Sequence, residues 1–596
     1  MTASFIHPAL ILIFGALFLP LVRGPFRAVY LCLIPILTLL NVIYLSWHPG
    51  VYGVVNFLDS WTLIFGRVDG LSMVFGFIMA LMAIIGTVYG LHVRDNSQHI
   101  AAWFYVAGSL GVIYCGDYLV LFLFWEMMAF ASTFLIWFNR EKGAVAAGFR
   151  YLLVHTFGGV LLLLGFVLRY QTTGDLSFGQ LDAQQADLST WLIMAGLMLN
   201  AAVVPLHSWL PDAYSKATIT GAVFMCAFTT KTAVYTLARA FAGFEILIVL
   251  GVVMAIYGII YALLENDVRR LLGWEIVSQV GYMVAGVGIG TALAINGTCA
   301  HAFAHILYKG LLFMAAGAVI HATGKSKFTE LGGLYRKMPL TLVFMVIGGI
   351  SVSAFPFFSG FVSKSMIVSA AFEAHLLPAA FLLLMVSVGT FLVAGLRLPY
   401  LIFFGENRCS PATWDSASDP PWNMQLAMIA AAFLCFFIGS YYPFLYNMLP
   451  HQGISYHPYS GYHLSETLQI LGFTALAFAF FKDKIGAREV ISLDLDWFYR
   501  KGGKGFLWLA SHPVQWLDNV WGAAYRVVGL YCLMTLARFS AWFDWHGIDG
   551  LVDGSARCVR AIGRRVAMVL QRGNIQQTIY LSVTFAAILL VSYVWL

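Results

Sequence analysis

Three ionisable residues, His301, His305 and Lys309, recur at four-residue spacing within one apolar run of the sequence. Residues four apart lie on the same face of an α-helix, so this spacing predicts a row of proton-binding side chains along one helical face. Charge at the centre of a bilayer costs roughly 3 kcal/mol or more, and it persists mainly where it pairs, lines water or carries ions. The row therefore predicts a proton relay. The alternative is a buried structural His pair with a lysine that reaches toward the membrane interface.

Two further ionisable residues lie in other apolar runs, Glu126 in LFLFWEMMAFAS and Lys231 in CAFTTKTAVYTLA. A carboxyl group in so apolar a run is expected to be protonated or matched to a cation, and Lys231 is its natural partner. A change in the distance between the two groups would then move protons. A purely structural salt bridge between two helices is the alternative. For His207 and Asp212, which flank a helix break, the alternative is a set of caps or loop hydrogen bonds.

The composition predicts the elements that must hold these side chains. Hydrophobic residues make up 60% of the 596-residue chain and charged residues 10%, with 48 Phe and 17 Trp. About 16 apolar runs approach the roughly 20 residues that a spanning helix needs, the first of them at 6–22, 28–47, 71–92, 100–116, 118–138 and 147–169. We therefore expect an all-α polytopic membrane protein, whose first run is a retained helix and not a cleaved signal peptide.

Basic residues are concentrated in alternate loops. They follow the odd-numbered helices, at Arg23, Arg27, Arg94, Arg140, Lys142, Arg269, Arg270, Lys325, Lys327, Arg336 and Lys337. The loops between them are poorer in basic residues or are acidic, as in 171–190. Because basic loops stay on the cytoplasmic side, this pattern places the N-terminus outside, and we expect the protein in the inner membrane of a bacterial cell.

The sequence offers no ligand pattern for a metal or a cofactor. The eight cysteines are scattered singly and form no CxxC or Cys/His spacing, which disfavours zinc, iron–sulfur and disulfide sites. A P-loop and a strand-borne GxGxxG are also lacking, so the chain itself is expected to bind neither ATP nor a dinucleotide. We predict no cofactor, no nucleic-acid partner and no redox chemistry on this chain.

Two hydrophobic segments are interrupted by proline and glycine in a similar way. The first is NAAVVPLHSWLPDAYSKAT, with Pro205 and Pro211, and the second is ISVSAFPFFSGFVSKSM, with Pro356 and Gly360. Proline removes a backbone donor and breaks a helix, and broken backbone at membrane depth is tolerated only where it is buried or lines a cavity. Paired breaks of this kind are typical of repeat-built transporters with an ion path at the midplane.

The motifs together resemble a known superfamily. They are WEMM around Glu126, PLHSWLPDAYSKAT at 205–218, KTAVY at 231–235, ENDVRRLLGWEIVSQVGYM at 265–283, HAFAHILYKGLLFMAAGAVIH at 301–321 and FPFFSGFVSKS at 355–365. This order resembles the antiporter-like subunits of respiratory complex I, the D-type and A-type subunits of Mrp sodium/proton antiporters, and the large membrane subunits of group 4 membrane-bound hydrogenases. The resemblance covers most of residues 60–400 and does not separate these three groups.

The resemblance implies fourteen core helices, two inverted five-helix repeats and proton transfer along a central hydrated axis. Carried over by motif, Glu126 matches the glutamate of the fifth helix and Lys231 the lysine of the eighth. His301, His305 and Lys309 fall on the relay of the eleventh helix, and Lys364 on the ionisable position after the second break. His207 lies within the first broken segment and is assigned to the same path.

Two positions depart from the family pattern. Asn200 stands five residues before Pro205, where the family usually has the lysine that partners the glutamate, and Glu275 stands where a small hydroxyl residue is common. An asparagine cannot take up or release a proton near neutral pH. Either Lys231 has taken over the role of the missing lysine, or the half-channel formed by the first repeat does not pump. Water held by the Asn200 amide is a further way to bridge Glu126 and Lys231.

The tail after about residue 482 differs from a plain fourteen-helix subunit. Apolar Val559, Ile562, Val566, Val569 and Leu570 alternate at helical spacing with Arg557, Arg560, Arg564 and Arg565, which predicts an amphipathic helix at the cytoplasmic membrane surface. The order resembles the distal complex I subunit, whose lateral helix runs along its neighbours and ends in one extra span. A simple lipid-facing helix is the alternative, and the sequence leaves open whether 522–542 spans the membrane or lies on it.

The expected organisation has six parts. They are N-terminal transmembrane helices (1–99), the first inverted-repeat half with its broken helix near 200–218 (100–243), the second half with its broken helix near 350–365 (244–400), C-terminal core helices (401–482), a cytoplasmic-side lateral segment (483–576) and a final transmembrane helix (577–596).

The sequence favours a proton-translocating subunit of an Mrp-type monovalent cation/proton antiporter complex. A proton-pumping subunit of a complex I-like oxidoreductase or of a membrane-bound hydrogenase is the second hypothesis, and a non-transporting membrane scaffold is the third. The expected partners are other membrane subunits, protons and the lipid bilayer. Whether sodium or potassium is carried as well, and what drives transport, are left open.

Overall fold

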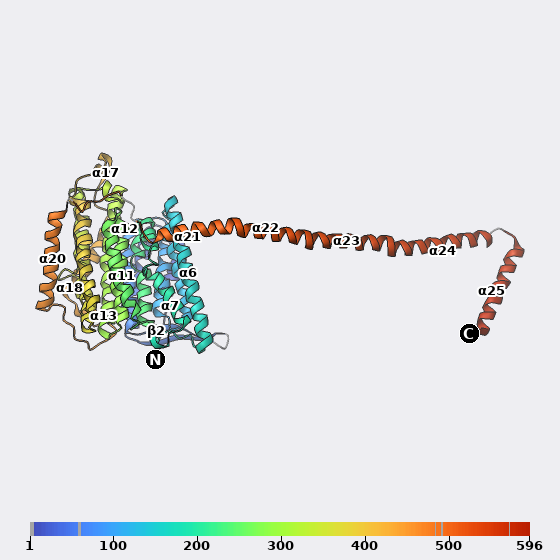
Figure 1. Ribbon diagram of the computed structural model, residues 1–596, viewed down its shortest axis with the longest axis horizontal. Coiled ribbons are helices and arrows are strands. Elements are labelled where there is room, and N and C mark those ends of the chain that lie inside the picture. The colour runs from blue at the N-terminus through green and yellow to red at the C-terminus, as the bar shows by residue number, and fades with distance from the viewer. Residues whose placement is uncertain (1–4, 58–60, 483, 490–492, 571–572, 596) are drawn as a thin grey trace. The chain divides into compact units, whose positions relative to one another are not determined.

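The computed structural model describes residues 5–57, 61–482, 484–489, 493–570 and 573–595 (Figure 1). The chain divides into two units, Met1–Leu495 and Asp496–Leu596. The first unit is a bundle of helices and holds every predicted site residue. Residue 483, at which we expected the lateral segment to begin, lies outside the described residues.

The first unit consists mainly of apolar helices. They are α1 (Pro8–Phe18), α2 (Phe26–Ser46), α3 (Gly70–Tyr89), α4 (Asn96–Tyr114), α5 (Tyr118–Trp137), α6 (Lys142–Thr173), α7 (Leu188–Asn200), α8 (Trp209–Lys216), α9 (Ile219–Met225), α10 (Thr229–Ala240), α11 (Ile246–Leu264), α12 (Val268–Ile289), α13 (Ala292–Thr323), α14 (Pro339–Val352), α15 (Ser359–Glu373), α16 (Leu377–Thr390), α17 (Pro411–Ser416), α18 (Trp422–Ser440), α19 (Pro443–Tyr446) and α20 (Gly461–Phe481). Across the described residues of the whole chain, 12 helices are long and apolar enough to span a membrane. The total of fourteen core helices stays a prediction.

Aspartate side chains begin several of these helices. Asp69, Asp95, Asp117, Asp187 and Asp267 each accept a hydrogen bond from a backbone N–H in the first turn of the following helix. These N–H groups have no partner within the helix, so a capping carboxylate removes an unpaired donor at the membrane edge. The chain therefore enters each of these spans at a defined residue.

A β-hairpin is the part of the fold that the all-α prediction missed. Strands β1 (Gly50–Phe57) and β2 (Trp61–Val68) pair antiparallel, with Gly50 opposite Val68 and Phe57 opposite Trp61. Both segments are rich in β-branched and aromatic residues, which favour strands. Their apolar character had counted only toward the composition of a membrane protein.

The chain is interrupted at both places where the sequence predicted a helix break. The chain leaves α7 at Asn200 and resumes in α8 at Trp209, and it leaves α14 at Val352 and resumes in α15 at Ser359. Each break contains an alanine in the left-handed region, with φ of 56° at Ala202 and 59° at Ala354. Residues other than glycine seldom adopt this conformation, so the two breaks share an uncommon local geometry.

A third interruption, not expected from the sequence, separates α9 from α10. Met225 ends the first piece and Thr229 begins the second, although no proline lies between them. In the direct continuation of α16, residues Phe391–Arg397 and Tyr400–Phe404 are π-helical. π-Segments within α-helices are often found at functional sites.

Two long helices, α6 and α13, correspond to each other in detail. Each spans 32 residues, and each ends at a glycine in the left-handed conformation, Gly174 and Gly324. The loop after each helix returns to the start of an earlier one, because the N–H of Tyr118 donates to the Leu176 carbonyl and that of Val268 to the Ser326 carbonyl, both at 2.9 Å. Helices α5 and α6 are thus tied as α12 and α13 are.

The correspondence extends to a pair of arginines. Arg239 near the end of α10 lies over the Phe178 ring at 5.9 Å, and Arg397 after α16 lies over the Phe328 ring at 5.4 Å. The two phenylalanines follow α6 and α13 at the same distance along the chain. These matches support the two-repeat organisation that the resemblance implies, whereas its inverted topology stays a prediction.

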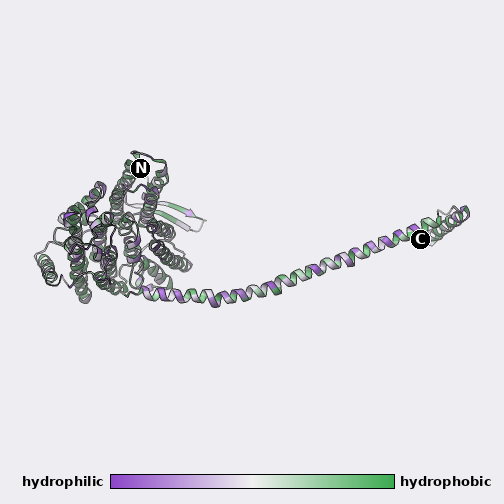
Figure 2. Ribbon diagram, turned by 90° about the horizontal axis from the view of Figure 1, so that it is seen from above, coloured by the Kyte–Doolittle hydropathy of each residue, from purple (hydrophilic) through white to green (hydrophobic). Residues whose placement is uncertain are grey.

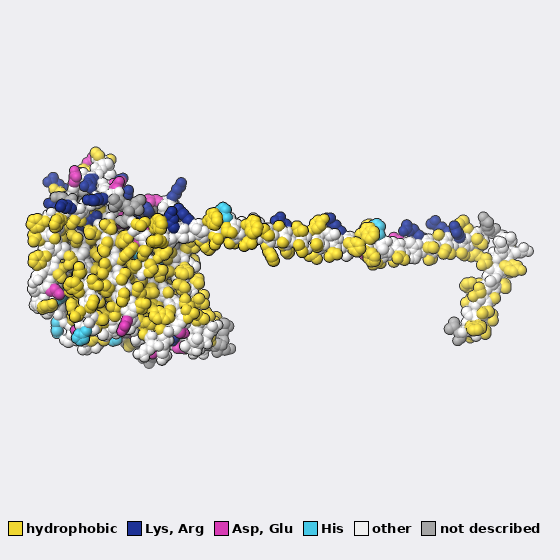
Figure 3. All heavy atoms as spheres, in the orientation of Figure 1, with side chains coloured by type: hydrophobic (Ala, Val, Ile, Leu, Met, Phe, Trp, Pro, Cys, Tyr) yellow, Lys and Arg dark blue, Asp and Glu magenta, His cyan; other side chains and the backbone are white. Residues whose placement is uncertain are grey.

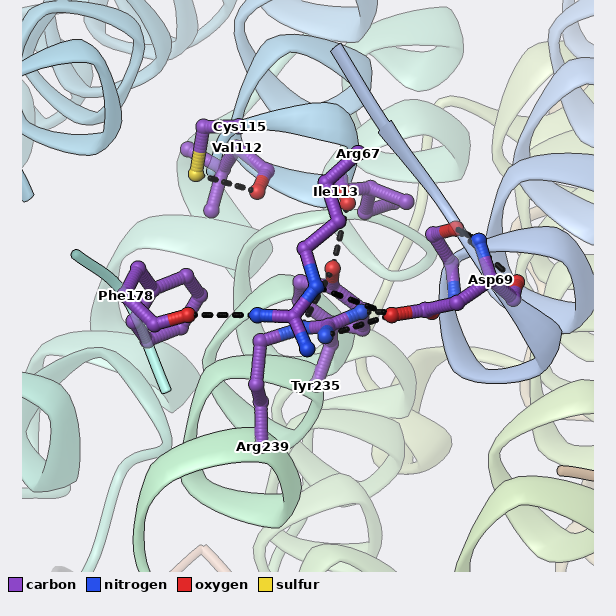
Figure 4. Close-up of polar contacts among 9 residues, drawn as sticks. Arg67, Asp69, Val112, Ile113, Cys115, Phe178, Tyr235 and Arg239 are labelled. Carbon is purple, nitrogen blue, oxygen red and sulfur yellow. Dashed lines mark hydrogen bonds and ion pairs between the residues drawn. The ribbon is translucent and has the colours of Figure 1, made fainter. Parts of the chain in front are cut away.

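Arg239 is held in the first unit by a carboxylate. Its guanidinium nitrogens donate to the two carboxylate oxygens of Asp69 at 2.7 and 2.8 Å, and Arg67 donates to Asp69 at 3.1 Å (Figure 4). Burial alone would raise the pKa of Asp69, but the hydrogen bond and charge of Arg239, with the Ser72 N–H and the Arg67 charge, hold that pKa at about 2. The start of α3 is thereby fixed against the end of α10.

The second unit begins with one continuous helix, Asp496–Leu570, of 75 residues. It contains α21 (Asp496–Leu509), α22 (Gln515–Ala524), α23 (Cys532–Phe543) and α24 (Asp549–Leu570), joined by short π-helical turns. Segment 522–542 is therefore part of a longer helix and has no end of its own. Polar and apolar residues alternate along it (Figure 2), and a second helix, α25 (Ile575–Trp595), follows.

Charge is distributed unevenly on the first unit. Lys and Arg side chains gather at one end of its apolar band (Figure 3). A band of apolar side chains bounded by charge is the surface expected of a bundle that lies in a bilayer.

Candidate functional site

The row of His301, His305 and Lys309 lies in the middle of α13, and none of the three side chains has exposed surface. The ring centroids of His301 and His305 are 6.2 Å apart. Neither ring nitrogen of His305 has a hydrogen-bond partner among the described residues. Buried polar groups are ordinarily hydrogen-bonded, so we expect water to be the hydrogen-bond partner of His305.

Lys309 forms an ion pair with Glu275 of α12. Its Nζ lies 2.5 Å from Glu275 Oε2, and both side chains are fully buried. The sequence singled out Glu275 only as a departure from the family pattern and assigned it no partner. A lone carboxylate in the apolar run LLGWEIVSQV was the available signal, but its distance of 34 residues from Lys309 hid the pairing.

Lys231 lies at the third helix break. Its Nζ donates to the Cys226 carbonyl at 2.7 Å and to the Thr230 hydroxyl at 3.1 Å. Cys226 follows the last residue of α9, so the amine meets the negative end of that helix dipole. No carboxylate within the described residues pairs with Lys231, and the Glu126 partnership that we expected is not formed.

Lys364 makes the same kind of contact at the second predicted break. Its Nζ donates at 3.0 Å to the carbonyl of Val352, the last residue of α14, and lies 5.0 Å from the centre of the Tyr282 ring. Both lysines thus lie against the carboxyl end of a half-helix, where a cation is favoured by the unpaired carbonyl groups. The helix breaks create these sites because they place carbonyl groups at membrane depth.

Aromatic and hydroxyl side chains connect Lys364 to the histidine row. The Tyr282 and His301 ring centroids are 5.9 Å apart, and His301 Nδ1 lies 3.3 Å from the Ser363 hydroxyl. The Tyr308 hydroxyl lies 3.5 Å from His301 Nε2. Ionisable and hydroxyl groups of α15, α12 and α13 therefore lie next to one another.

A cavity of about 370 Å³ opens beside Lys364. It lies between α15, α16, the first turns of α20 and the segment leading into α20, and its lining includes Ser365, Ser369, Glu373, His463 and Glu466. Glu373 is the last residue of α15, so the polar lining continues from Lys364 to the end of that helix. The cavity gives Lys364 a polar approach from one end of the bundle.

Glu126 has a different environment from Glu275. Its Oε1 is buried and has no hydrogen-bond partner among the described residues. The carboxyl group faces Gly159 of α6 so closely that a β-carbon placed on that glycine would lie 1.9 Å from Glu126 Oε1. The carboxyl end of Glu126 therefore fills the space beside position 159 and would have to move to admit a side chain there.

Asn200 is bonded to a residue that the sequence analysis missed. His155 Nδ1 lies 2.9 Å from Asn200 Oδ1, and both side chains are buried. His155 holds the same position within α6 that His305 holds within α13, and this internal match is the signal that would have found it. The first half thus has a histidine–amide pair at its helix break.

Residues 115–392 match the family described as NADH:quinone oxidoreductase/Mrp antiporter, TM. The chain is 34% identical over 351 residues to NADH-quinone oxidoreductase subunit N of Desulforudis audaxviator. This match covers 56% of this chain and 69% of that protein. The chain belongs to the NADH:quinone oxidoreductase/Mrp antiporter transmembrane family. It is also 30% identical over 380 residues to the D-type subunit of the Na(+)/H(+) antiporter of Alkalihalophilus pseudofirmus, covering 59% and 76% of the two chains.

Other members of the family are longer than this chain. The A-type subunit of the Na(+)/H(+) antiporter of Alkalihalophilus pseudofirmus is 32% identical over an alignment of 345 residues. The match covers 52% of this chain but only 43% of that protein. The Mrp complex of Dietzia sp. DQ12-45-1b contains a chain of the same fold, with a TM-score of 0.66 at 21% identity, covering 79% of this chain and 98% of that one. The protein is therefore a multi-pass membrane protein with the fold of the family's antiporter-like subunits.

The last predicted site residue, His207, lies between α7 and α8. Its Nε2 is 3.3 Å from Asp494 Oδ1, and the same carboxylate oxygen accepts a hydrogen bond from the Tyr257 hydroxyl at 2.6 Å. Asp212, its neighbour in the motif, accepts from Arg150 at 2.6 and 2.8 Å. His207 therefore joins the first broken helix to the segment just before Asp496, which the sequence did not foresee.

Proposed function

We propose that the chain is the proton-translocating, antiporter-like subunit of an Mrp-type monovalent cation/proton antiporter complex. The observation that carries this proposal is the file of buried ionisable groups on α10, α12, α13 and α15, namely Lys231, His305, Lys309, Glu275, His301 and Lys364. Buried charge is expensive in a membrane and is kept where ions or protons move. The proposed path also includes Glu126, Asn200 and His207, which lie in the first half.

Proton movement along this file requires groups that exchange protons and hydrogen-bonded links between them. His301 and His305 are one helical turn apart, and Lys309 follows one turn later. Water supplies links across gaps that side chains do not close, such as the one around His305. We propose that protons reach Lys364 through the cavity beside it and are passed along α13.

Orientation follows from the distribution of charge. We propose that the end of the bundle that bears most Lys and Arg residues faces the cytoplasm, with the N-terminus outside, in the inner membrane of a bacterial cell. The cavity beside Lys364 adjoins the C-terminal end of α15 and the segment before α20. The exchanged cation is sodium or potassium, and the partners are the other membrane subunits of the complex.

A complex I-like or hydrogenase-like complex is the second candidate. It is favoured by the relative that is part of an NADH-quinone oxidoreductase and by the 75-residue helix Asp496–Leu570, none of whose side chains is buried. An amphipathic helix with this much exposed apolar surface fits a position along other membrane subunits or on lipid. Redox chemistry would then take place on other chains.

Proton uptake into inverted membrane vesicles, followed by fluorescence quenching, tests the proposal. The variant His305→Gln removes a titrating group from the centre of the row, and we expect proton movement to fall at least tenfold. His321→Gln is the matched control, because His321 lies near the end of the same helix and outside the buried row. Wild-type vesicles that move no protons under any cation gradient would favour the non-transporting scaffold.

Purification of the intact complex separates the two transport candidates. Small Mrp-type membrane subunits that copurify with the chain support the antiporter. Iron–sulfur or hydrogenase-like subunits would replace it with the second candidate. Each result can be read by mass spectrometry of native-gel bands without any assay of transport.

A further inference from the structure

The internal repeat places Glu275 in correspondence with Glu126. Each glutamate follows a tryptophan, Trp274 and Trp125. Glu275 lies eight residues after Asp267, which caps α12, and Glu126 lies nine residues after Asp117, which caps α5. The loops after α13 and α6 bond to the starts of these helices in the same way. The two carboxyl groups therefore lie at corresponding places in the two halves, to within one residue along their helices.

Their neighbours on the long helices correspond as well. Lys309 is residue 18 of the 32 in α13, and Gly159 is residue 18 of the 32 in α6. Glu275 pairs with Lys309, and Glu126 faces Gly159. The same helix position therefore holds a lysine in the second half and a glycine in the first.

We propose that Glu275 and Lys309 are the proton-exchanging acid–base pair of this chain. This pair lies in the second half and serves in place of the glutamate–lysine pair of the first half, which is missing here because Asn200 stands at the position of the lysine. This inference rests on the proposed function and assigns to Glu275 a role that the motif match does not give it. The geometry points to it because the pair is fully buried and in direct contact.

The exchange step is a proton transfer between the two partners. The N–H bond of the Lys309 ammonium breaks, an O–H bond forms on Glu275 Oε2, and a neutral amine faces a neutral carboxylic acid. The reverse transfer restores the ion pair, so neither electrons nor a co-reactant is needed. A proton arriving at the amine from the His305 side, and one leaving the carboxyl group, complete a cycle with no net change in the pair.

The surroundings of the pair suit this exchange. His305 lies one turn before Lys309 on α13, on the same face. Glu275 Oε1 is buried and bonds to no described residue, and Gln279, one turn further along α12, also has a buried side-chain oxygen without a partner. Water at these oxygens would give the carboxyl group its outlet, because groups of this kind are seldom left without hydrogen bonds.

The competing interpretation is a structural ion pair. Removal of one partner from a buried pair is damaging in either case, since an unpaired charge is left in the core. Single substitutions therefore cannot separate the two interpretations. Replacement of both partners by uncharged residues of similar size can, because a structural pair tolerates such a change and a proton-exchanging pair does not.

The deciding variant is the double substitution Glu275→Gln with Lys309→Met in the full complex. We expect it to assemble at wild-type levels on native gels and to lose at least tenfold in proton uptake by vesicles. The matched control is Glu330→Gln with Lys325→Met, which neutralises an exposed pair at 3.1 Å outside the path. Proton uptake within twofold of wild type in the Glu275→Gln, Lys309→Met variant overturns the inference. The proposed function is judged separately, because it stands as long as wild-type vesicles take up protons.

A second measurement applies if the double variant does not accumulate. Glu275→Asp keeps the acid and shortens its reach by one methylene, so we expect transport with an altered pH dependence and reduced maximal rate. An unchanged pH profile overturns the inference. In infrared difference spectra between acid and alkaline pH, the wild-type protein is expected to show a carboxylic-acid band that Glu275→Gln removes, and retention of the whole band in that variant also overturns it.

Discussion

The two halves of the first unit use similar helices to hold different chemistry. In the first half, Glu126 faces a glycine and Asn200 bonds to His155. In the second half, the equivalent carboxyl group of Glu275 contacts Lys309. The long helices α6 and α13 share their length of 32 residues and their C-terminal glycine, so this difference in chemistry lies in the side chains that they and their neighbours carry.

This comparison separates what the fold supplies from what the residues decide. The breaks supply carbonyl groups at membrane depth, and each half uses them to hold a lysine, Lys231 after α9 and Lys364 after α14. Whether a half also contains a paired carboxylate and lysine depends on which residues stand at a few positions. A half can therefore lose its pair by one substitution and keep its shape.

The largest expected contrast is in stability. Lys309→Met leaves Glu275 buried without its cation, which costs about 3–5 kcal/mol for a fully buried pair. Lys231→Met removes two hydrogen bonds but also removes a buried amine with no carboxylate partner, and these effects oppose each other. We expect the loss in melting temperature of the purified protein to be at least twice as large for Lys309→Met. Equal losses would contradict the difference between the halves.

A smaller effect is expected when the first half is made to resemble the second. Gly159→Lys places an amine beside Glu126, whose flexible carboxyl end must move because a β-carbon would lie 1.9 Å from Oε1. We expect the pH of half-maximal proton uptake to change, with the maximal rate kept within about threefold. Gly159→Met adds similar bulk without charge. If both variants show the same pH profile, the contact between positions 126 and 159 has no electrostatic role.

The smallest effect concerns the carboxylate that holds Arg239. The pKa of Asp69 is about 2, below the ordinary value near 3.8, so the stabilisation from its contact with Arg239 is present above about pH 4 and is lost as the pH falls toward 2. Since the Asp69 side chain is 34% exposed, we expect Asp69→Asn to cost about 1–2 kcal/mol at pH 7. Thermal unfolding at pH 7 and pH 3 checks this, and the variant should differ less from wild type at pH 3. An equal difference at both pH values would contradict it.

Hydropathy and proline placement predicted much of the fold. Apolar runs marked the spans, and the prolines at 205 and 356 marked both breaks, because a missing N–H has a local effect on helix backbone. The hairpin at 50–68 and the break between α9 and α10 had weaker signals. In the first case apolar composition masked strand propensity, and in the second no proline marks the interruption.

The site was predicted only as far as single residues go. Spacing alone placed His301, His305 and Lys309 on one helical face. Partnerships between helices could not be read from spacing, so Lys231 was assigned to Glu126 although its amine contacts the Cys226 carbonyl. Glu275 needed the packing of α12 against α13 to reveal its partner. Comparison of α6 with α13 in the sequence would have drawn attention to Gly159 and His155.

The closeness of Glu275 and Lys309 has an electrical consequence. A charge that crosses the whole membrane against 100 mV takes up about 2.3 kcal/mol, and the hydrocarbon core is about 30 Å thick. Transfer over the 2.5 Å between Nζ and Oε2 crosses less than a tenth of that field, or about 0.2 kcal/mol per 100 mV. Exchange within the pair is thus nearly indifferent to voltage. The membrane potential acts instead on the steps that load and unload it, and any voltage dependence of transport measures those steps.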